Sequence, residues 1–187
     1  ASVHQLLLNE AKKTSRTFNE VLQHYAIERF IYRLSKSHHS KRFVLKGALM
    51  FYVWCGPASR PTMDLDLLGK IDNNIESIIA VIKDAMEVDV EPDGILFNPE
   101  TITATRITED VEYEGVRVRL QGNLGNARVS LQIDIGFGDV IVPGPSKVKY
   151  PVLLDFPSPE LYGYSMESVI AEKFEAMTKR GILNSRM

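Results

Sequence analysis

Asp64-Leu65-Asp66-Leu67-Leu68-Gly69 is the stretch of this sequence that says most about the fold. Its leucines are typical of a buried β-strand, and a glycine closes the run. Successive side chains of a strand point to opposite faces of a sheet, so we expect Asp64 and Asp66 to lie on the same face. Two neighbouring carboxylates repel each other when they are buried, and a divalent cation removes that cost. The stretch therefore predicts a strand that carries metal ligands.

A third carboxylate, Asp134, lies in a later strand candidate at residues 127–137. Alternation predicts that Leu131, Ile133 and Ile135 share one face of that strand and that Asp134 lies on the other. An aspartate on a solvated face would give the same pattern, so both interpretations stay open for this residue. If Asp134 joins the pair, three carboxylates from two strands form an oxygen-rich site suited to Mg²⁺ and phosphate chemistry.

Other classes of protein also use two aspartates at this spacing. A capped strand end with both carboxylates in water is one alternative, but Asp66 lies inside an apolar run. Glycosyltransferases hold the metal of a nucleotide sugar with such a pair. Aspartyl phosphatases use one aspartate as a nucleophile and place a hydroxyl two residues after the pair, where this chain has Leu68. The pair thus favours metal-assisted phosphate chemistry without fixing the reaction.

Lys46-Gly47-Ala48 follows a short strand candidate at residues 43–45 and precedes a helical run at residues 48–54. Glycine lets a backbone approach a phosphate, and the start of a helix presents free amide groups. Lys46 adds a positive charge. A tight turn with a surface lysine is the competing interpretation. Because the turn lies shortly before the aspartate pair, we expect a phosphate-binding turn and the metal ligands to share one cleft.

Two further basic residues are candidate anion contacts. Lys173 falls near the middle of an apolar stripe on a helix predicted after Ser165, where a lysine either extends along the core edge or meets an anion such as a triphosphate. Arg60 lies four residues before Asp64. The four histidines show no spacing typical of metal ligands, and no nucleophile system of the Ser-His-Asp or Cys-His kind is present.

The predicted elements follow one another as helices, strand, helix, strand, helix, a three-stranded antiparallel meander and a helix. Capping boxes at Ser2 and Thr17 start the first two helices, and the proline-rich residues 143–159 predict an extended connector. This order indicates a mixed α/β fold with one central sheet. We expect residues 1–40 to form N-terminal helices packed on a catalytic core at residues 41–187.

Net charge is −2 over 187 residues, so no global positive field attracts nucleic acid. Charge is nevertheless uneven: residues 29–46 are basic without an acid, and residues 84–114 are mainly acidic. Two solvated faces of opposite sign explain this pattern, and a basic rim beside the metal site is the alternative. The sequence contains no predicted signal peptide and no membrane span, so we expect no membrane partner and a cytoplasmic location.

Four segments together resemble the AbiEii/AbiGii toxin family, which comprises nucleotidyltransferase-like toxins of type IV toxin–antitoxin and phage abortive-infection systems. The resemblance runs from about Ala26 to Met187, and these segments carry it: FVLKGAL from Phe43, RPTMDLDLLG from Arg60, QIDIGFGD from Gln132 and SVIAEKFEAM from Ser168. It implies a DNA polymerase β-like nucleotidyltransferase fold, with a mixed central sheet flanked by helices. It also implies a native protein that continues past Met187.

The resemblance assigns roles to individual residues. Asp64 and Asp66 are expected to bind two Mg²⁺ ions, with Asp134 as the third ligand or the base. Gly47 and Ala48 would form the phosphate loop beside Lys46 and Arg60, and Lys173 matches the lysine on the family's helix. The expected partners are an NTP, a tRNA or protein acceptor, and a cognate antitoxin.

The leading hypothesis is metal-dependent transfer of a nucleoside monophosphate from an NTP to a tRNA 3′ end or to a protein hydroxyl. The second hypothesis is a nucleotide-binding or antitoxin-interaction module without catalysis. A metal-dependent phosphohydrolase is the third.

Overall fold

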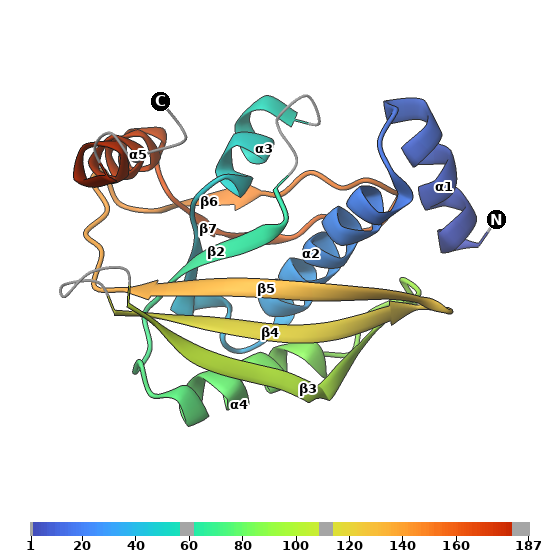
Figure 1. Ribbon diagram of the computed structural model, residues 1–187, viewed down its shortest axis with the longest axis horizontal. Helices are drawn as coiled ribbons and strands as arrows, with labels where there is room; N and C mark the ends of the chain where they lie inside the picture. The colour runs from blue at the N-terminus through green and yellow to red at the C-terminus, as the bar shows by residue number, and fades with distance from the viewer. Residues whose placement is uncertain (1, 57–61, 109–113, 181–187) are drawn as a thin grey trace.

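The computed structural model describes residues 2–56, 62–108 and 114–180 (Figure 1). The described helices are α1 (Val3–Thr14), α2 (Phe18–Lys36), the 3₁₀ turn η1 (Ser40–Arg42), α3 (Leu49–Cys55), α4 (Ile75–Met86) and α5 (Met166–Arg180). The strands are β1 (Phe43–Leu45), β2 (Asp64–Gly69), β3 (Ile95–Thr108), β4 (Glu114–Leu124), β5 (Ala127–Phe137), β6 (Ser146–Lys149) and β7 (Glu160–Gly163). The predicted mixed α/β class is confirmed.

The strands form one seven-stranded sheet in the order β3-β4-β5-β2-β1-β7-β6. The long strands β3, β4 and β5 make the predicted antiparallel meander. β2 then pairs parallel to β5 and antiparallel to β1, and β7 pairs parallel to β1. The parallel pairing of β2 with β5 is what brings the two predicted acidic strands side by side.

Local capping explains where the helices begin. The Thr17 hydroxyl accepts the Glu20 amide while the Glu20 carboxylate accepts the Thr17 amide, so this predicted capping box is complete. Ser2 accepts the Gln5 amide at the start of α1, although the Gln5 side chain turns to Asn9 instead of back to the cap. These caps satisfy amide groups that the first helical turn leaves free.

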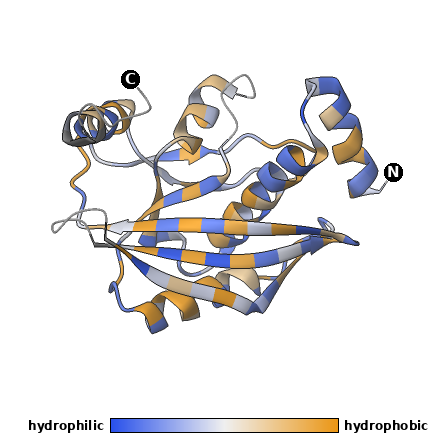
Figure 2. Ribbon diagram, viewed as in Figure 1, coloured by the Kyte–Doolittle hydropathy of each residue, from blue (hydrophilic) through white to orange (hydrophobic). Residues whose placement is uncertain are grey.

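The two faces of the sheet differ in character. Leu65, Leu67 and Ile133 are buried on the face where α2 packs against β5. α4 packs against α2 and β3 below the sheet in the view of Figure 1. Figure 2 shows apolar and polar residues alternating along β4 and β5, as expected for strands with one covered face. The opposite face carries Asp64 and Asp66.

The first two basic residues of segment 29–46, Arg29 and Arg33, belong neither to a solvated basic face nor to a basic rim beside the metal site. Both expectations are wrong for these two residues. These side chains are buried in α2. The Arg33 guanidinium donates two hydrogen bonds to Asp93, at 2.7 and 3.0 Å, and lies over an aromatic ring. Arg29 forms an ion pair with Glu28 at 3.0 Å. The acidic segment 84–114 thus supplies a buried partner, which charge patterning along the chain cannot reveal.

The proline-rich residues 143–159 include the edge strand β6, and β7 follows at once. The sequence missed both strands because each is only four residues long. α2 packs against the sheet and contributes to the hydrophobic core. The division of the chain into two parts at residue 40 stays a prediction. None of the described helices has the length and apolar character needed to cross a membrane.

Candidate active site

The register between β2 and β5 pairs Asp66 directly with Asp134, and Asp64 with Gln132. Residues paired in this way point to the same face of a sheet. The aspartates at 64, 66 and 134 therefore share one face, here called the aspartate face, opposite the buried leucines. Asp134 is half-buried on this face, and its role as a metal ligand stays a prediction.

Burial and mutual repulsion act on the carboxylates of the aspartate face. Burial and then the neighbouring Asp134 raise the pKa of Asp66 to about 6, although Lys46 acts in the opposite direction. Burial and Asp134 also raise the pKa of the more exposed Asp64. The ionised form of both aspartates is therefore less favourable than it is in water. A cation bound between them would stabilise the ionised form.

Arg117 on β4 holds the Asp134 carboxylate. The two residues are paired across the antiparallel strands β4 and β5. Arg117 Nε donates to Asp134 Oδ1 at 2.8 Å, and Nη2 donates to Oδ2 at 2.7 Å. Such a two-point arginine–carboxylate pair is strong and fixes the orientation of both groups. The sequence analysis missed Arg117, because only the register of two distant strands identifies it.

Gly47 lies against Asp66 in the turn between β1 and α3. Its φ angle is +68°, a conformation that glycine adopts without strain. A Cβ atom at this position would collide with the Asp66 carboxylate. The preceding Lys46 amide donates to the Asp66 carbonyl at 3.1 Å, and the exposed Ala48 follows at the start of α3. The turn at Gly47 therefore lies in contact with Asp66. That Gly47 and Ala48 bind phosphate stays a prediction.

Lys46 lies between two carboxylates that the sequence analysis did not assign to the site. Its Nζ donates to Asp139 at 2.7 Å and to Glu172 at 2.9 Å. The Tyr164 hydroxyl donates to the same Asp139 oxygen at 2.9 Å. The sequence around Asp139 favours a turn residue and gives no sign of these bonds. Burial raises the pKa of Glu172, and Lys46 opposes that shift. This cluster ties α5 to the turn at Gly47.

Lys173 on α5 is exposed, and its Nζ lies 4.4 Å from the centre of the Phe51 ring on α3. The predicted apolar stripe of α5 is only partly buried: Val169 packs in the core, but Met166 and Ile170 are exposed. α5 therefore lies at the edge of the core rather than within it. The anion-binding role of Lys173 stays a prediction. Arg60, the other predicted anion contact, lies outside the described residues.

A different set of metal-ligand side chains stands closer together than the aspartates do. His38, His39 and Asp84 can each place a donor atom within 4.8 Å of the others, the only such group among the described residues. His39 Nε2 is 3.0 Å and His38 Nε2 is 3.9 Å from Asp84 Oδ2. The sequence missed this group because Asp84 comes from α4. The three aspartates are not gathered to that spacing, and Asp134 turns to Arg117 instead.

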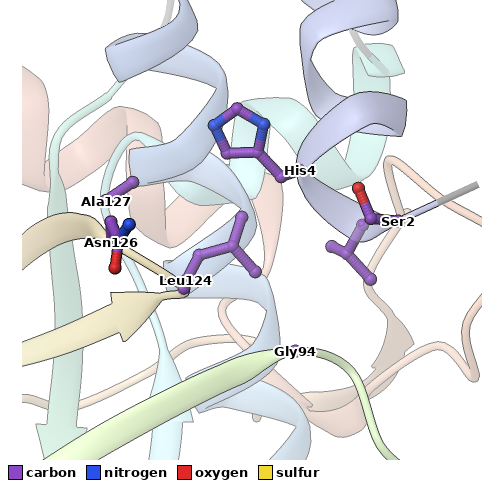
Figure 3. Close-up of a pocket in the computed structure, with 8 residues that line it drawn as sticks. Ser2, His4, Gly94, Leu124, Asn126 and Ala127 are labelled. Carbon is purple, nitrogen blue, oxygen red and sulfur yellow. The ribbon is translucent and has the colours of Figure 1, made fainter.

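A cavity of about 440 Å³ lies far from the aspartate face, between the start of α1 and the β4–β5 turn. Figure 3 shows Leu124, His4 and Ser2 among its lining residues. β5 begins beside it at Ala127, so Asp134 lies about 23 Å further along the strand at roughly 3.3 Å per residue. None of its lining residues is acidic or a lysine. It is separate from the candidate active site.

Comparison with known proteins decides the family. The model of the nucleotidyl transferase AbiEii toxin family, type IV TA system, matches residues 29–187. The chain belongs to the AbiEii family. The match spans the aspartates, the turn at Gly47 and Lys173, so these residues lie in the part of the chain that defines the family. The resemblance inferred from the four sequence segments is confirmed.

Two solved structures resemble this chain. JHP933 from Helicobacter pylori superimposes with a TM-score of 0.53 at 19% identity, over 83% of this chain and 56% of that protein. A candidate nucleotidyltransferase from H. pylori gives a TM-score of 0.49 at 20% identity, over 81% of this chain and 56% of its own. This AbiEii chain thus spans a little over half the length of either solved protein. No curated protein matches it.

Proposed function

We propose that this AbiEii chain carries the catalytic centre of a metal-dependent nucleotidyltransferase, which moves a nucleoside monophosphate from an NTP to a hydroxyl of a cellular acceptor. The observation that carries the proposal is the pairing of Asp66 with Asp134 beside the turn at Gly47. The acceptor would be a tRNA 3′ end or a protein hydroxyl. Growth would stop as a result, and a cognate antitoxin would counteract this effect.

The donor set fits Mg²⁺. Carboxylate oxygens are the ligands that this hard cation prefers, and burial, followed by the neighbouring Asp134, raises the pKa of Asp66. Asp64 and Asp66 would hold the metal, and Asp134 would join them after leaving Arg117. When bound, two Mg²⁺ ions would increase the nucleophilicity of the acceptor hydroxyl and neutralise the pyrophosphate.

The chain's own residues would position the reactants. In the transfer, the acceptor oxygen forms a bond to the α-phosphorus, the bond from that phosphorus to the bridging oxygen breaks, and pyrophosphate leaves. A carboxylate of the aspartate face would accept the hydroxyl proton. The backbone at Gly47 would approach the phosphates, while Lys46 and Lys173 would supply positive charge. Ion pairs with Asp139 and Glu172 fix the position of the Lys46 ammonium group.

One observation favours a second function. Arg117 occupies both oxygens of Asp134, and two carboxylates occupy Lys46. A chain that stayed in this arrangement would bind a nucleotide, or an antitoxin, without transferring anything. No described feature favours the phosphohydrolase.

Incubation with α-³²P-labelled NTPs, Mg²⁺ and total RNA or total protein separates these functions. The proposal predicts that label appears in one acceptor class, and that Asp66→Asn and Asp64→Asn abolish the labelling. His38→Ala/His39→Ala, which removes the other group of metal-ligand side chains, should leave it unchanged. NTP binding without any labelled acceptor would favour the second function. Phosphate release from simple esters would favour a phosphohydrolase.

A further inference from the structure

A cavity of about 560 Å³ lies where the end of α2 and the turn η1 face the edge strands β6 and β7. Four lysines line it, and we call it the lysine cavity: Lys36, Lys41, Lys147 and Lys149. Three serines and Tyr162 add hydroxyl groups, and Glu160 is the one acidic residue in its wall. A chain whose net charge is −2 thus gathers four positive charges around one hollow.

The four lysines are not held by carboxylates of the described residues, although Glu160 is the cross-strand neighbour of Lys149. All four are exposed, and within the described part of the chain none of them forms an ion pair. Lys46, in contrast, contacts two carboxylates. Like charges around one hollow repel each other, and an anion in the hollow would relieve that repulsion. Ammonium and hydroxyl groups together are the donors that proteins use for phosphate oxygens.

The lysine cavity and the aspartate face are connected by the register of the sheet. Lys147 pairs with Tyr162 on β7, and Tyr162 pairs with Val44 on β1. Val44 pairs with Leu68, which lies two residues after Asp66 on β2. Paired residues share a face, so Lys147 and Asp66 project to the same side of the sheet.

The separation of the two places suits an extended polymer. Glu160 lines the lysine cavity at the start of β7, whereas Tyr164, just after the strand, hydrogen-bonds Asp139 beside Lys46. The four steps between these residues cover about 13 Å along β7 at 3.3 Å per residue, and the two strand spacings from β7 to β2 add about 10 Å across the sheet, so the two places lie about 16 Å apart. A nucleic acid strand bridges such a distance with about five nucleotides at 3.4 Å each. An acceptor could therefore contact both places at once.

We propose that the lysine cavity binds the phosphate backbone of a nucleic-acid acceptor and so holds the reactive hydroxyl at the aspartate face. This inference rests on the proposed function and selects a nucleic acid, not a protein, as the acceptor. A hollow lined by lysine and hydroxyl groups matches a chain of phosphates. Its lysines make no base-specific arrangement, so they would position the acceptor and leave sequence selection to other contacts.

The test compares two quadruple variants that lose the same charge. One removes the cavity lysines (K36Q/K41Q/K147Q/K149Q), and the matched control removes four lysines elsewhere (K12Q/K13Q/K70Q/K83Q). Thermal melting confirms that both fold. The probe is a short fluorescein-labelled RNA hairpin with an unpaired 3′ end, and binding is followed by fluorescence anisotropy over a series of salt concentrations.

The cavity variant should bind the hairpin about tenfold more weakly or worse, and its salt slope should fall by about 0.7–0.9 for each phosphate that a lysine no longer neutralises. The control should bind like the wild type. An equal decrease in both variants, or no decrease in the cavity variant, overturns the proposal. So does cavity-dependent binding to phosphatidylserine vesicles or to a poly-glutamate peptide without binding to RNA.

A second measurement keeps the two proposals apart. NTP binding, measured by isothermal titration, should be the same in the wild type and in both quadruple variants. RNA binding through the cavity in a chain that transfers no label supports the cavity and contradicts the proposed function. Labelled transfer that both quadruple variants perform equally well supports the proposed function and contradicts the cavity.

Discussion

Asp66 on β2 and Asp134 on β5 are direct partners across two parallel strands, although 68 positions separate them in the sequence. Their carboxylates project from the same face, and burial together with this neighbour raises the pKa of Asp66 to about 6. A fold that needed neither metal nor substrate here would gain by replacing one of them with a neutral residue. The pair is therefore the feature on which the functional account rests.

Releasing Asp134 should strengthen metal binding. Arg117→Ala removes both hydrogen bonds to the Asp134 carboxylate, each of the charge-assisted kind that contributes about 1.5–3 kcal/mol. We expect Mn²⁺, measured by electron paramagnetic resonance or calorimetry, to bind about tenfold more tightly than in the wild type. Arg119→Ala is the control for the loss of charge: it removes a positive charge that acts on Asp64 but no hydrogen bond to Asp134 among those described, so its effect should be smaller. Unchanged affinity in Arg117→Ala would exclude Asp134 as a ligand.

Gly47 should tolerate no side chain. Gly47→Ala places a methyl group in the position of the Asp66 carboxylate and forces alanine into a left-handed conformation. We expect it to lower the free energy of unfolding by about 2–5 kcal/mol in a urea titration. Gly125→Ala shares the backbone strain, with φ at +57°, but its Cβ meets nothing within 4 Å, so it should cost about 1–2 kcal/mol. Equal decreases would show that Asp66 does not abut the turn.

The buried pair of Arg33 and Asp93 should be essential for stability. Arg33→Met would leave the carboxylate of Asp93, which is 2% exposed, without its guanidinium partner. We expect the free energy of unfolding to fall by about 3–5 kcal/mol, measured by urea titration. Arg42→Met, on an exposed turn, should change it by about 0.5 kcal/mol or less. A small effect of Arg33→Met would mean that water reaches Asp93.

Stability should fall on mild acidification because of His24. Burial lowers the pKa of His24 to about 4, below its ordinary value of 6.5, and its Nε2 lies 3.3 Å from the Tyr150 hydroxyl. Between pH 4 and pH 6.5, His24 is therefore protonated in the unfolded chain but neutral in the folded chain. The neutral His24 therefore contributes fully to the free energy of unfolding above pH 6.5. This contribution is lost as the pH falls toward 4, and the total loss is about 3 kcal/mol.

Urea titrations over that pH range test the assignment. His24→Gln should be less stable at neutral pH but should show a smaller decrease in stability on acidification than the wild type. His4→Gln, on exposed α1, should keep the wild-type profile. An unchanged slope in His24→Gln would assign the acid sensitivity to another group.

Local patterns in the sequence predicted the helices, the meander and the shared face of the aspartates. The alternation around Asp66 and Asp134 reports the face of each strand, because side-chain direction depends only on position within the strand. Which strands become neighbours depends on the whole sheet. Arg117 was therefore missed, as were Asp139 and Glu172, which lie 93 and 126 positions from the lysine they contact.

The errors have the same origin. Arg33 appears as surface charge in the sequence because its partner Asp93 is 60 positions away. The apolar stripe predicted on α5 is only partly covered, since Met166 and Ile170 remain exposed in the described chain. Short strands such as β7 give almost no periodic signal of their own, and pairing with β1 decides that they form.

Isothermal titration of an NTP into the wild-type protein, with and without Mg²⁺, tests the central claim most directly. The account predicts that binding is much tighter with Mg²⁺, and that Asp64→Asn/Asp66→Asn binds the nucleotide equally weakly whether or not the metal is present. His38→Ala/His39→Ala should retain the full metal effect. Nucleotide binding of the same strength with and without Mg²⁺ in the wild type would contradict a metal centre on the aspartate face.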